Sequence, residues 1–330
     1  MKLRGAHSCH SFLRASLLLG LIVLAGCGRK GSSEYTIAVI PKGTTHEFWK
    51  SIHAGALKAE EEISKAGTRV SIIWKGPLRE NDREQQIQVV EGFLSQGVEG
   101  LVLAPLDDKA LVRPVEEARR AGIPTVIIDS GLDSAETVSF VATDNFNGGE
   151  LAAQRLGELL PRGGKVILLR YQEGSASTHN REEGFLSKLR SSFPRLRVLS
   201  SDQYAGATRE TAKQAAENLL NRFGEDIQGV FCPNESSTAG MLLALEDRGL
   251  AGRVVFVGFD AAMALLQALE GGELQGLVVQ DPFKMGYLGV KTMVAHLQGR
   301  PVERRIDTGV SLLTRDNLEE FKGASRRPQP

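Results

Sequence analysis

The chain has little cysteine, no excess of either charge and only one long apolar run, and each shortage excludes a class of protein. Three cysteines in 330 residues are too few for a disulfide scaffold or a typical zinc cage. Its 40 basic and 40 acidic residues give a formal net charge of zero, which argues against a broad nucleic-acid-binding surface. Hydrophobic residues make up 42% of the chain, which is enough for sizeable folded cores.

The sequence also lacks the common motifs of phosphate, dinucleotide and metal binding. Gly163-Gly164-Lys165 is followed by Val166, where a Walker motif requires serine or threonine. No strand-like segment leads into a GxGxxG loop, and no pair of histidines has the spacing of a zinc site. We therefore expect neither a metal ion nor an organic cofactor, and we assign no catalytic residue.

The one long apolar run lies at the N-terminus and is typical of a secretory signal. Residues 15–24 (ASLLLGLIVL) follow a basic start and are too few for a stable membrane span, which needs about 20 residues. The run ends in Leu24-Ala25-Gly26-Cys27, which resembles the lipobox of bacterial lipoproteins. We expect a signal peptide over residues 1–26, lipidation of Cys27 and a polar tether over residues 27–34. The alternative is an ordinary signal peptide with an incidental cysteine.

Beyond the tether, short apolar segments alternate with segments of helical periodicity. The apolar segments are nearly continuous in Val, Ile and Leu, which is typical of strands covered on both faces of a parallel sheet. Between them, residues such as Phe48, Ile52, Ala56 and Ala59 recur on one helical face. Strands are expected at residues 35–40, 70–74, 100–104, 125–129, 165–169, 197–199, 229–232, 254–259 and 276–280.

This alternation predicts a doubly wound α/β fold rather than a β-sandwich or a helix bundle. Nine strands are many for a single sheet in a chain of this length, so we predict two sheets and hence two lobes. The chain should change from one lobe to the other near residues 140–143.

The residues that follow the expected strands are planar polar groups accompanied by a few aromatic rings. In open α/β sheets, ligands bind at the carboxyl ends of the strands, so these residues are candidates for a binding site. Asp129 ends one strand, and Asn234 and Asp260 follow two others. Acids and amides satisfy hydroxyl groups in fixed directions, while aromatic faces stack on the C–H faces of a sugar ring. The set favours a carbohydrate ligand.

Seven ordered motifs resemble those of the ribose-type periplasmic sugar-binding proteins, the type I solute-binding family of sugar ABC transporters. The resemblance runs from about residue 35 to residue 321. It implies an α/β fold with two doubly wound parallel-sheet lobes joined by a three-segment hinge. The motifs are Phe48-Trp49, Asp129 at a strand end, and the segments 143–149 (TDNFNGG), 181–185 (REEGF), 230–235 (VFCPNE), 257–260 (VGFD) and 280–282 (QDP).

The family's three crossings between lobes imply the domain boundaries of this chain. The N-terminal lobe is expected over residues 35–142 and 282–309, and the C-terminal lobe over residues 143–281 and 310–323. The last residues, 324–330, are expected to form a disordered tail. Closure of the hinge would bury a sugar between the lobes.

The resemblance also implies which residues bind the ligand. Three aromatic residues would flank the sugar ring, and five polar residues would bond its hydroxyl groups. The aromatic residues are Phe48, Trp49 and Tyr204; the polar residues are Asp129, Arg181, Asn234, Asp260 and Gln280.

Two ligand positions depart from the family pattern, and a third residue nearby is ambiguous. His46 stands where ribose binders have asparagine, and Ser130 follows Asp129 where they have arginine. The loss of a bidentate guanidinium changes which hydroxyls can be held, so we expect a ligand other than ribose. Lys42 either reaches the cleft or is a solvated loop lysine.

Taken together, these features predict a monomeric, extracytoplasmic solute-binding protein, lipid-anchored to a membrane in the periplasm or on the cell surface. It would capture a monosaccharide or related polyol and deliver it to an ABC transporter permease and ATPase complex, without enzymatic activity or nucleic acid. One alternative is a receptor that presents an autoinducer-type furanose to a sensor kinase, since it would use the same residues. Another is a glycosidase, because Asp129 and Asp260 could face one cleft, but sugar binding also needs carboxylates there.

Overall fold

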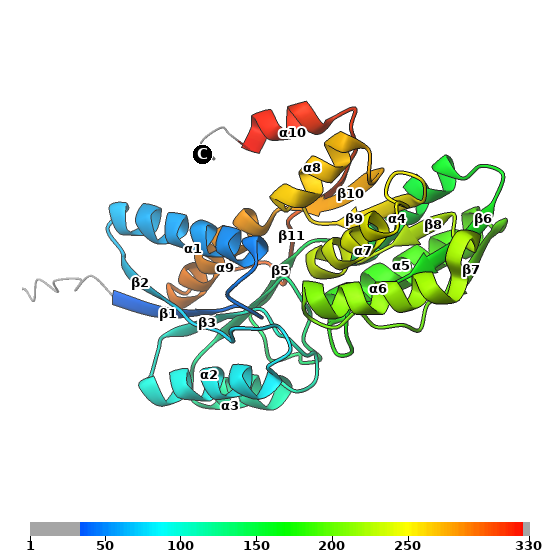
Figure 1. Ribbon diagram of the computed structural model, residues 1–330. Helices are drawn as coiled ribbons and strands as arrows, with labels where there is room; N and C mark the ends of the chain where they lie inside the picture. The colour runs from blue at the N-terminus through cyan, green and yellow to red at the C-terminus, as the bar shows by residue number, and fades with distance from the viewer. Residues whose placement is uncertain (1–33, 326–330) are drawn as a thin grey trace, which may run out of the picture. The chain divides into compact units, whose positions relative to one another are not determined.

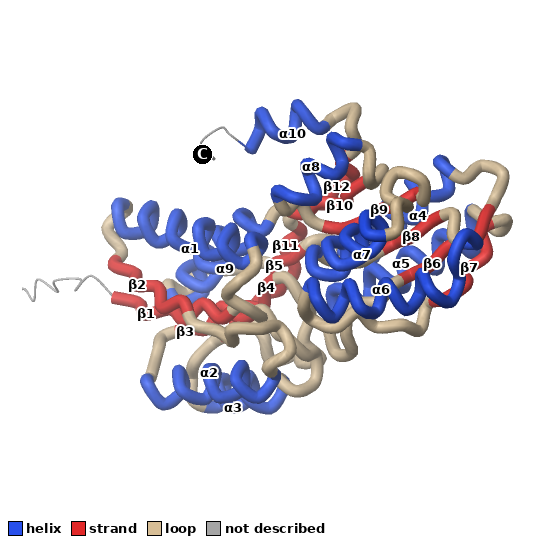
Figure 2. Tube along the Cα trace, in the orientation of Figure 1, coloured by secondary structure: helices blue, strands red, loops and turns tan. Residues whose placement is uncertain are grey.

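The computed structural model describes residues 34–325, which contain two six-stranded sheets (Figures 1 and 2). The first sheet has the strand order β11-β5-β4-β3-β1-β2, and every neighbouring pair in it is parallel. Its strands are β1 (Glu34–Ile40), β2 (Arg69–Trp74), β3 (Gly100–Leu103), β4 (Thr125–Ile128), β5 (Ser139–Ala142) and β11 (Arg305–Asp307).

The second sheet has the order β12-β10-β9-β8-β6-β7 and is parallel except for β12, which is antiparallel to β10. The two orders correspond strand for strand, so the two halves of the fold repeat one topology apart from the direction of the edge strands β11 and β12. The strands of the second sheet are β6 (Gly164–Leu168), β7 (Leu196–Ser200), β8 (Gly229–Phe231), β9 (Val255–Phe259), β10 (Gly276–Gln280) and β12 (Val310–Leu313).

Helices cover both faces of each sheet, and each sheet with its helices is called a lobe below (Figure 1). The first lobe contains α1 (Glu47–Lys65), α2 (Arg83–Gln96), α3 (Val112–Arg120) and α9 (Pro282–Leu297). The second lobe contains α4 (Asn145–Leu159), α5 (Ala176–Ser192), α6 (Arg209–Phe223), η1 (Gly224–Asp226), α7 (Glu235–Asp247), α8 (Met263–Gly271) and α10 (Leu318–Ser325).

Alternate residues of a central strand enter separate cores on the two faces of its sheet. Ile37 and Val39 of β1 pack with α1 and α9, whereas Ala38 and Ile40 pack with α2 and α3. Because both faces are buried over residues 37–40, this part of the strand has no polar side chain, which accounts for its continuous hydrophobic sequence. The predicted two-lobed, doubly wound α/β fold is therefore confirmed.

The chain passes between the two sheets three times, and two of these crossings carry a helix into the opposite lobe. After β5 the chain enters α4, which packs on β9, β10 and β12 of the second sheet. After β10 it enters α9, which packs on β3, β4 and β5 of the first sheet. The third crossing joins β11 to β12. These connections bring the carboxyl ends of the strands of both sheets to one region.

The ends of the chain bear on three sequence-based expectations. Glu34, expected in the tether, is the first residue of β1, and residues 324 and 325, expected in a disordered tail, belong to α10. The expected signal peptide and Cys27 lie outside the described residues. Within residues 34–325, no helix combines the length and the hydrophobicity that a membrane crossing requires.

Candidate functional site

A buried pocket of about 30 Å³ lies between the lobes and is lined by residues of both. A space of this size accommodates only a few water molecules, so a larger guest requires the lobes to separate. Beside it, a wider cleft of about 1160 Å³ runs along α1 and past the crossing at Asp281, and four residues line both spaces. These shared residues are Phe48, Glu235, Asp260 and Gln280.

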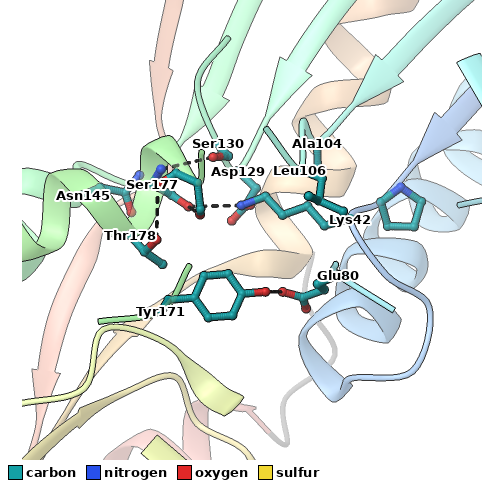
Figure 3. Close-up of polar contacts among 12 residues, drawn as sticks. Lys42, Glu80, Ala104, Leu106, Asp129, Ser130, Asn145, Tyr171, Ser177 and Thr178 are labelled. Atoms are coloured by element: carbon teal, nitrogen blue, oxygen red, sulfur yellow. Dashed lines mark hydrogen bonds and ion pairs between the residues drawn. The ribbon is translucent and has the colours of Figure 1, made fainter. Parts of the chain in front are cut away.

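In the first lobe, the carboxylate of Asp129 at the end of β4 forms an ion pair with Lys42. Lys42 follows β1, and its Nζ lies 3.0 Å from Asp129 Oδ2, with both side chains buried. The same Nζ donates to Ser177 Oγ of the second lobe over 3.2 Å. Figure 3 shows Lys42 extending between these two partners.

In the second lobe, the carboxylate of Asp260 at the end of β9 is held by two donors. The backbone N–H of Glu235 donates to Asp260 Oδ2 over 3.0 Å, and Gln280 Nε2 donates to Asp260 Oδ1 over 2.7 Å. Gln280 in turn accepts from Arg181 Nη2 over 3.0 Å. The guanidinium therefore acts on the carboxylate both through charge and through the Gln280 amide.

Asp129 and Asp260 share an unusual backbone conformation. Their φ angles are 62° and 70°, and no other non-glycine residue between 34 and 325 has a positive φ. Such conformations are unfavourable for residues with a Cβ atom and concentrate at functional sites, where the surrounding structure holds them. Because β4 and β9 are corresponding strands of the two sheets, the fold presents one strained carboxylate from each lobe.

Arg181 lies in α5 and is buried, with one acceptor on each of its three nitrogen atoms. Its Nε donates to Asn145 Oδ1 over 2.8 Å and its Nη1 donates to the Pro233 carbonyl over 2.9 Å. The guanidinium also lies 3.9 Å from the centre of the Phe259 ring. Burial lowers the pKa of Arg181, although the nearby carboxylates of Asp260 and Asp129 oppose that shift.

The pKa of Asp260 is raised to about 6. Loss of hydration is the largest cause, because burial disfavours the charged carboxylate. The positive charge of Arg181 and the hydrogen bond from Gln280 pull the pKa down without cancelling the effect of burial. A hydroxyl donor placed on this carboxylate would supply the solvation that the pocket withholds.

A third carboxylate, Glu80, lies buried in the loop between β2 and α2 and is contacted by three donor side chains. Trp49 Nε1 donates to Glu80 Oε1 over 2.6 Å, His46 Nδ1 lies 3.2 Å from the same oxygen, and the Tyr171 hydroxyl bonds the other (Figure 3). Burial alone would raise the pKa of Glu80, but the bonds and charge of His46 lead the contributions that lower it overall. The pKa of His46 is raised: burial lowers it, and Glu80 outweighs that effect. The site therefore favours a buried His46–Glu80 ion pair.

Eight of the predicted ligand residues line the pocket, although two of them have additional structural roles. Trp49 is buried, and its indole N–H is committed to Glu80, while Phe48 packs edge-on against it at 4.9 Å between ring centres. Asn234 also caps α7, accepting from the Ser237 N–H. The eight residues are His46, Phe48, Trp49, Asp129, Arg181, Asn234, Asp260 and Gln280.

Two predicted residues do not line the pocket. Ser130 is buried beside it, where its Oγ accepts from the Ser177 N–H over 3.1 Å. Tyr204 was expected to flank the ligand, and the structure places it instead against the Arg170 guanidinium, 4.8 Å from the ring centre. The reason is that Tyr204 follows the edge strand β7, and its loop pairs with the Arg170 backbone.

Several lining residues were not assigned from the sequence. Lys42 was left ambiguous, and Glu80 stands in a charged stretch that reads as a solvated turn. The other unassigned residues lie in the segment after β6 or at the start of α7. Both segments follow strands, so the sequence predicted binding residues there but did not indicate which ones line the pocket. They are Tyr171, Ser177, Thr178 and Glu235.

The chemistry of the pocket is that of hydroxyl recognition. Carboxylates accept, Lys42 and Arg181 donate, and Asn234 and Gln280 do both, while Phe48 and Trp49 supply apolar faces. Between residues 34 and 325, no cluster of His, Cys, Asp or Glu could hold a metal ion. Cys232, the free cysteine of this part of the chain, is buried, and burial raises its thiol pKa well above the usual value.

Comparisons with known proteins bear on the family and the fold of the chain. A sequence profile for the periplasmic binding protein domain matches residues 37–301. The ribose import binding protein of Bacillus subtilis (strain 168) is 29% identical over 309 residues, covering 90% of this chain and 97% of that protein.

Two solved structures are similar over most of the chain. A carbohydrate transporter solute binding protein from Agrobacterium radiobacter, in complex with D-arabinose, has a TM-score of 0.83 and 34% identity, covering 89% of this chain and 98% of that one. The periplasmic component of an ABC-type sugar transport system from Hahella chejuensis has a TM-score of 0.80 and 35% identity, covering 84% and 99%. These relatives are named as binding components of transport systems, not as enzymes.

Proposed function

Since the chain belongs to the family of periplasmic binding protein domains, as its motifs predicted, we propose that it captures a monosaccharide or related polyol between its lobes. The observation that carries this proposal is the facing pair of strained carboxylates, Asp129 and Asp260, each accompanied by a cation from its own lobe. Charged groups make the stronger hydrogen bonds to hydroxyls, and burial makes an unmatched one costly.

Binding would proceed by closure of the lobes on the ligand. A sugar held only by the first lobe meets Lys42 and Asp129, whereas the contacts of Arg181, Asn234 and Asp260 require the second lobe. The ligand therefore favours the closed arrangement, because only there does it satisfy both sets of groups. A permease and ATPase complex would then take up the sugar from the closed form.

Family membership supports a location outside the cytoplasm and delivery to an ABC transporter. The relatives described above are named for import or transport, so the signalling alternative, in which a sensor kinase reads the loaded protein, has no support. In this proposal the protein acts as a monomer, attached to the membrane through lipid on Cys27.

The lipid anchor is tested by changing Cys27 to Ala in the full-length chain. The unchanged protein should partition into the detergent phase of a cloud-point extraction, and the variant should move to the aqueous phase because it lacks acyl chains. Equal partitioning of the two proteins would exclude lipidation at this residue.

The binding function is tested by calorimetry and thermal unfolding with D-ribose, D-arabinose, D-allose and D-fucose. A true ligand should bind in the micromolar range, about −8 kcal/mol, and raise the unfolding midpoint in a dose-dependent way. Asp129→Asn should weaken binding about 10-fold or more, because it removes a charged acceptor. Tyr204→Phe, outside the pocket, serves as the matched control. Binding unchanged by Asp129→Asn would show that the site lies elsewhere.

A further inference from the structure

Lys42 is a cation of the pocket, and the acceptors of its ammonium group come from both lobes. It is 3% exposed, and its Nζ contacts Asp129 in the first lobe and Ser177 in the second. Ser177 is itself fixed to the first lobe, because its N–H donates to Ser130 Oγ. The ammonium group therefore lies where the lobes meet and where Asp129 faces the pocket.

The donor count of Lys42 leaves one hydrogen-bonding direction for a ligand. A lysine ammonium group has three N–H donors. Within the described chain, its acceptors are Asp129 Oδ2 and Ser177 Oγ. Arg181 differs, because the acceptors on its Nε, Nη1 and Nη2 all belong to the second lobe. Lys42 thus has one N–H left for a ligand at the boundary between the lobes.

The position of Lys42 bears on the serine that follows Asp129. Ser130 carries no charge and points its Oγ at the Ser177 backbone, so it offers the ligand no cation. Lys42, which follows β1, brings its positive charge to the carboxylate of Asp129 instead. A point charge on a flexible stem bonds one oxygen at a time, in contrast to the paired bonds of a guanidinium.

We propose, building on the sugar-binding function, that Lys42 contacts a single ligand hydroxyl and sets the specificity of the site for that position of the ring. The same hydroxyl lies within reach of Asp129, so the ligand group is held between an acceptor and a donor. Removing that one hydroxyl from the sugar should then abolish the contribution of Lys42 without affecting the other contacts.

The test compares the wild type, Lys42→Met and Lys42→Arg by calorimetry with D-arabinose and its monodeoxy derivatives. Lys42→Met should bind the parent sugar about 10- to 100-fold more weakly, yet bind one monodeoxy derivative as well as the wild type does. Lys42→Arg should recover part of the affinity. Lys50→Met, an exposed lysine near the start of α1, is the control and should match the wild type.

The outcomes separate a ligand contact from a structural role. If Lys42→Met weakens all sugars by the same factor, Lys42 only positions Asp129, and the proposal fails. If the variant binds every sugar within twofold of the wild type, the proposal also fails, while the binding function stands. If the wild type binds neither D-arabinose nor any other sugar tested, the proposed function itself fails. Should Lys42→Met not fold, Lys42→Gln takes its place, with a smaller expected loss for the parent sugar because the amide removes the charge but retains a donor.

Discussion

The carboxyl group of Asp260 experiences opposing influences from burial and from its neighbours. Its pKa in the folded protein is about 6, because burial outweighs the charge of Arg181 and the bond from Gln280. The unfolded chain has a pKa near 3.9 at this residue, so between the two values the folded state binds the extra proton. The stabilising contribution of this group is complete below about pH 4 and is lost as the pH rises through about 6.

In the sugar-free protein, Asp260→Asn should therefore remove the loss of folding stability that the wild type undergoes as the pH rises. Between pH 4 and pH 7.5, the free energy of unfolding of the variant relative to the wild type should rise by about 3 kcal/mol, from roughly two pKa units at about 1.4 kcal/mol each. Urea unfolding at both pH values measures this difference. A difference that is the same at both values would contradict the raised pKa.

At the residue scale, sequence reasoning located the acids and amides that end strands and missed the groups that come from loops. Asp129, Asp260 and Gln280 follow predictable strands, and their place at the sheet edge fixes which way they face. Glu80 becomes recognisable only when the fold places His46 and Tyr171 against it. For the same reason the sequence did not indicate that Trp49, predicted to flank the sugar ring, also donates its indole N–H to Glu80.

Helix packing at glycine positions determines where Arg181 lies. A Cβ atom on Gly149 of α4 would meet the Arg181 carbonyl oxygen at 1.9 Å, and one on Gly184 of α5 would meet the Phe146 carbonyl at 2.0 Å. The first lobe repeats this arrangement, since Gly286 of α9 similarly faces Ile52 of α1 at 2.0 Å. In both lobes, the helix that has crossed from the other sheet packs with its backbone close to its neighbour.

Gly149→Ala should consequently destabilise the protein by more than about 2 kcal/mol and weaken sugar binding, because α5 must move and carry Arg181 with it. Gly92→Ala in α2 is the matched control, since no atom lies within 4 Å of its added methyl group. That substitution should stabilise the protein by about 0.5–1 kcal/mol. Chemical unfolding and calorimetry measure both effects. Equal stabilities for the two variants would rule out the close contact.

At the element scale, the sequence predicted the strands of the sheet interiors better than those of the edges. The nine expected strands are present to within one residue at each end, because burial on both faces leaves an unbroken hydrophobic run. Three strands were not expected: β5 and β12, of four residues each, and β11. Strand β11 (RID) is short, largely exposed and paired on one side only. Its position depends on β5, which lies far away in the sequence.

At the scale of the whole molecule, polar contacts near the pocket join the two lobes without a ligand. The Tyr171 hydroxyl bonds Glu80, and Gln172 Nε2 donates to the Glu80 carbonyl over 2.9 Å. Farther along the same edge, the Asp108 N–H donates to the Gly174 carbonyl over 2.9 Å. These bonds stabilise the closed arrangement and therefore lower the cost of closing on a sugar.

Tyr171→Phe should shift the sugar-free protein towards the open arrangement. Loss of a hydrogen bond to a charged group should lower the equilibrium constant for closure by about 10-fold, and the sugar affinity should fall with the closed population. Small-angle X-ray scattering should report a larger radius of gyration for the variant without sugar and the wild-type value with saturating sugar. Tyr204→Phe should behave as the wild type does. Identical scattering of Tyr171→Phe and the wild type in the absence of sugar would show that this bond does not hold the lobes together.

The exchange of α4 and α9 between the lobes also limits when each half can fold during synthesis. The core of the first lobe includes Met285, Val290 and Met293 of α9, and its sheet is completed by β11. A nascent chain that ends before residue 282 lacks α9, which covers one face of the first sheet together with α1. Both cores therefore stay incomplete until most of the polypeptide has left the ribosome, so neither lobe can finish folding well ahead of the other.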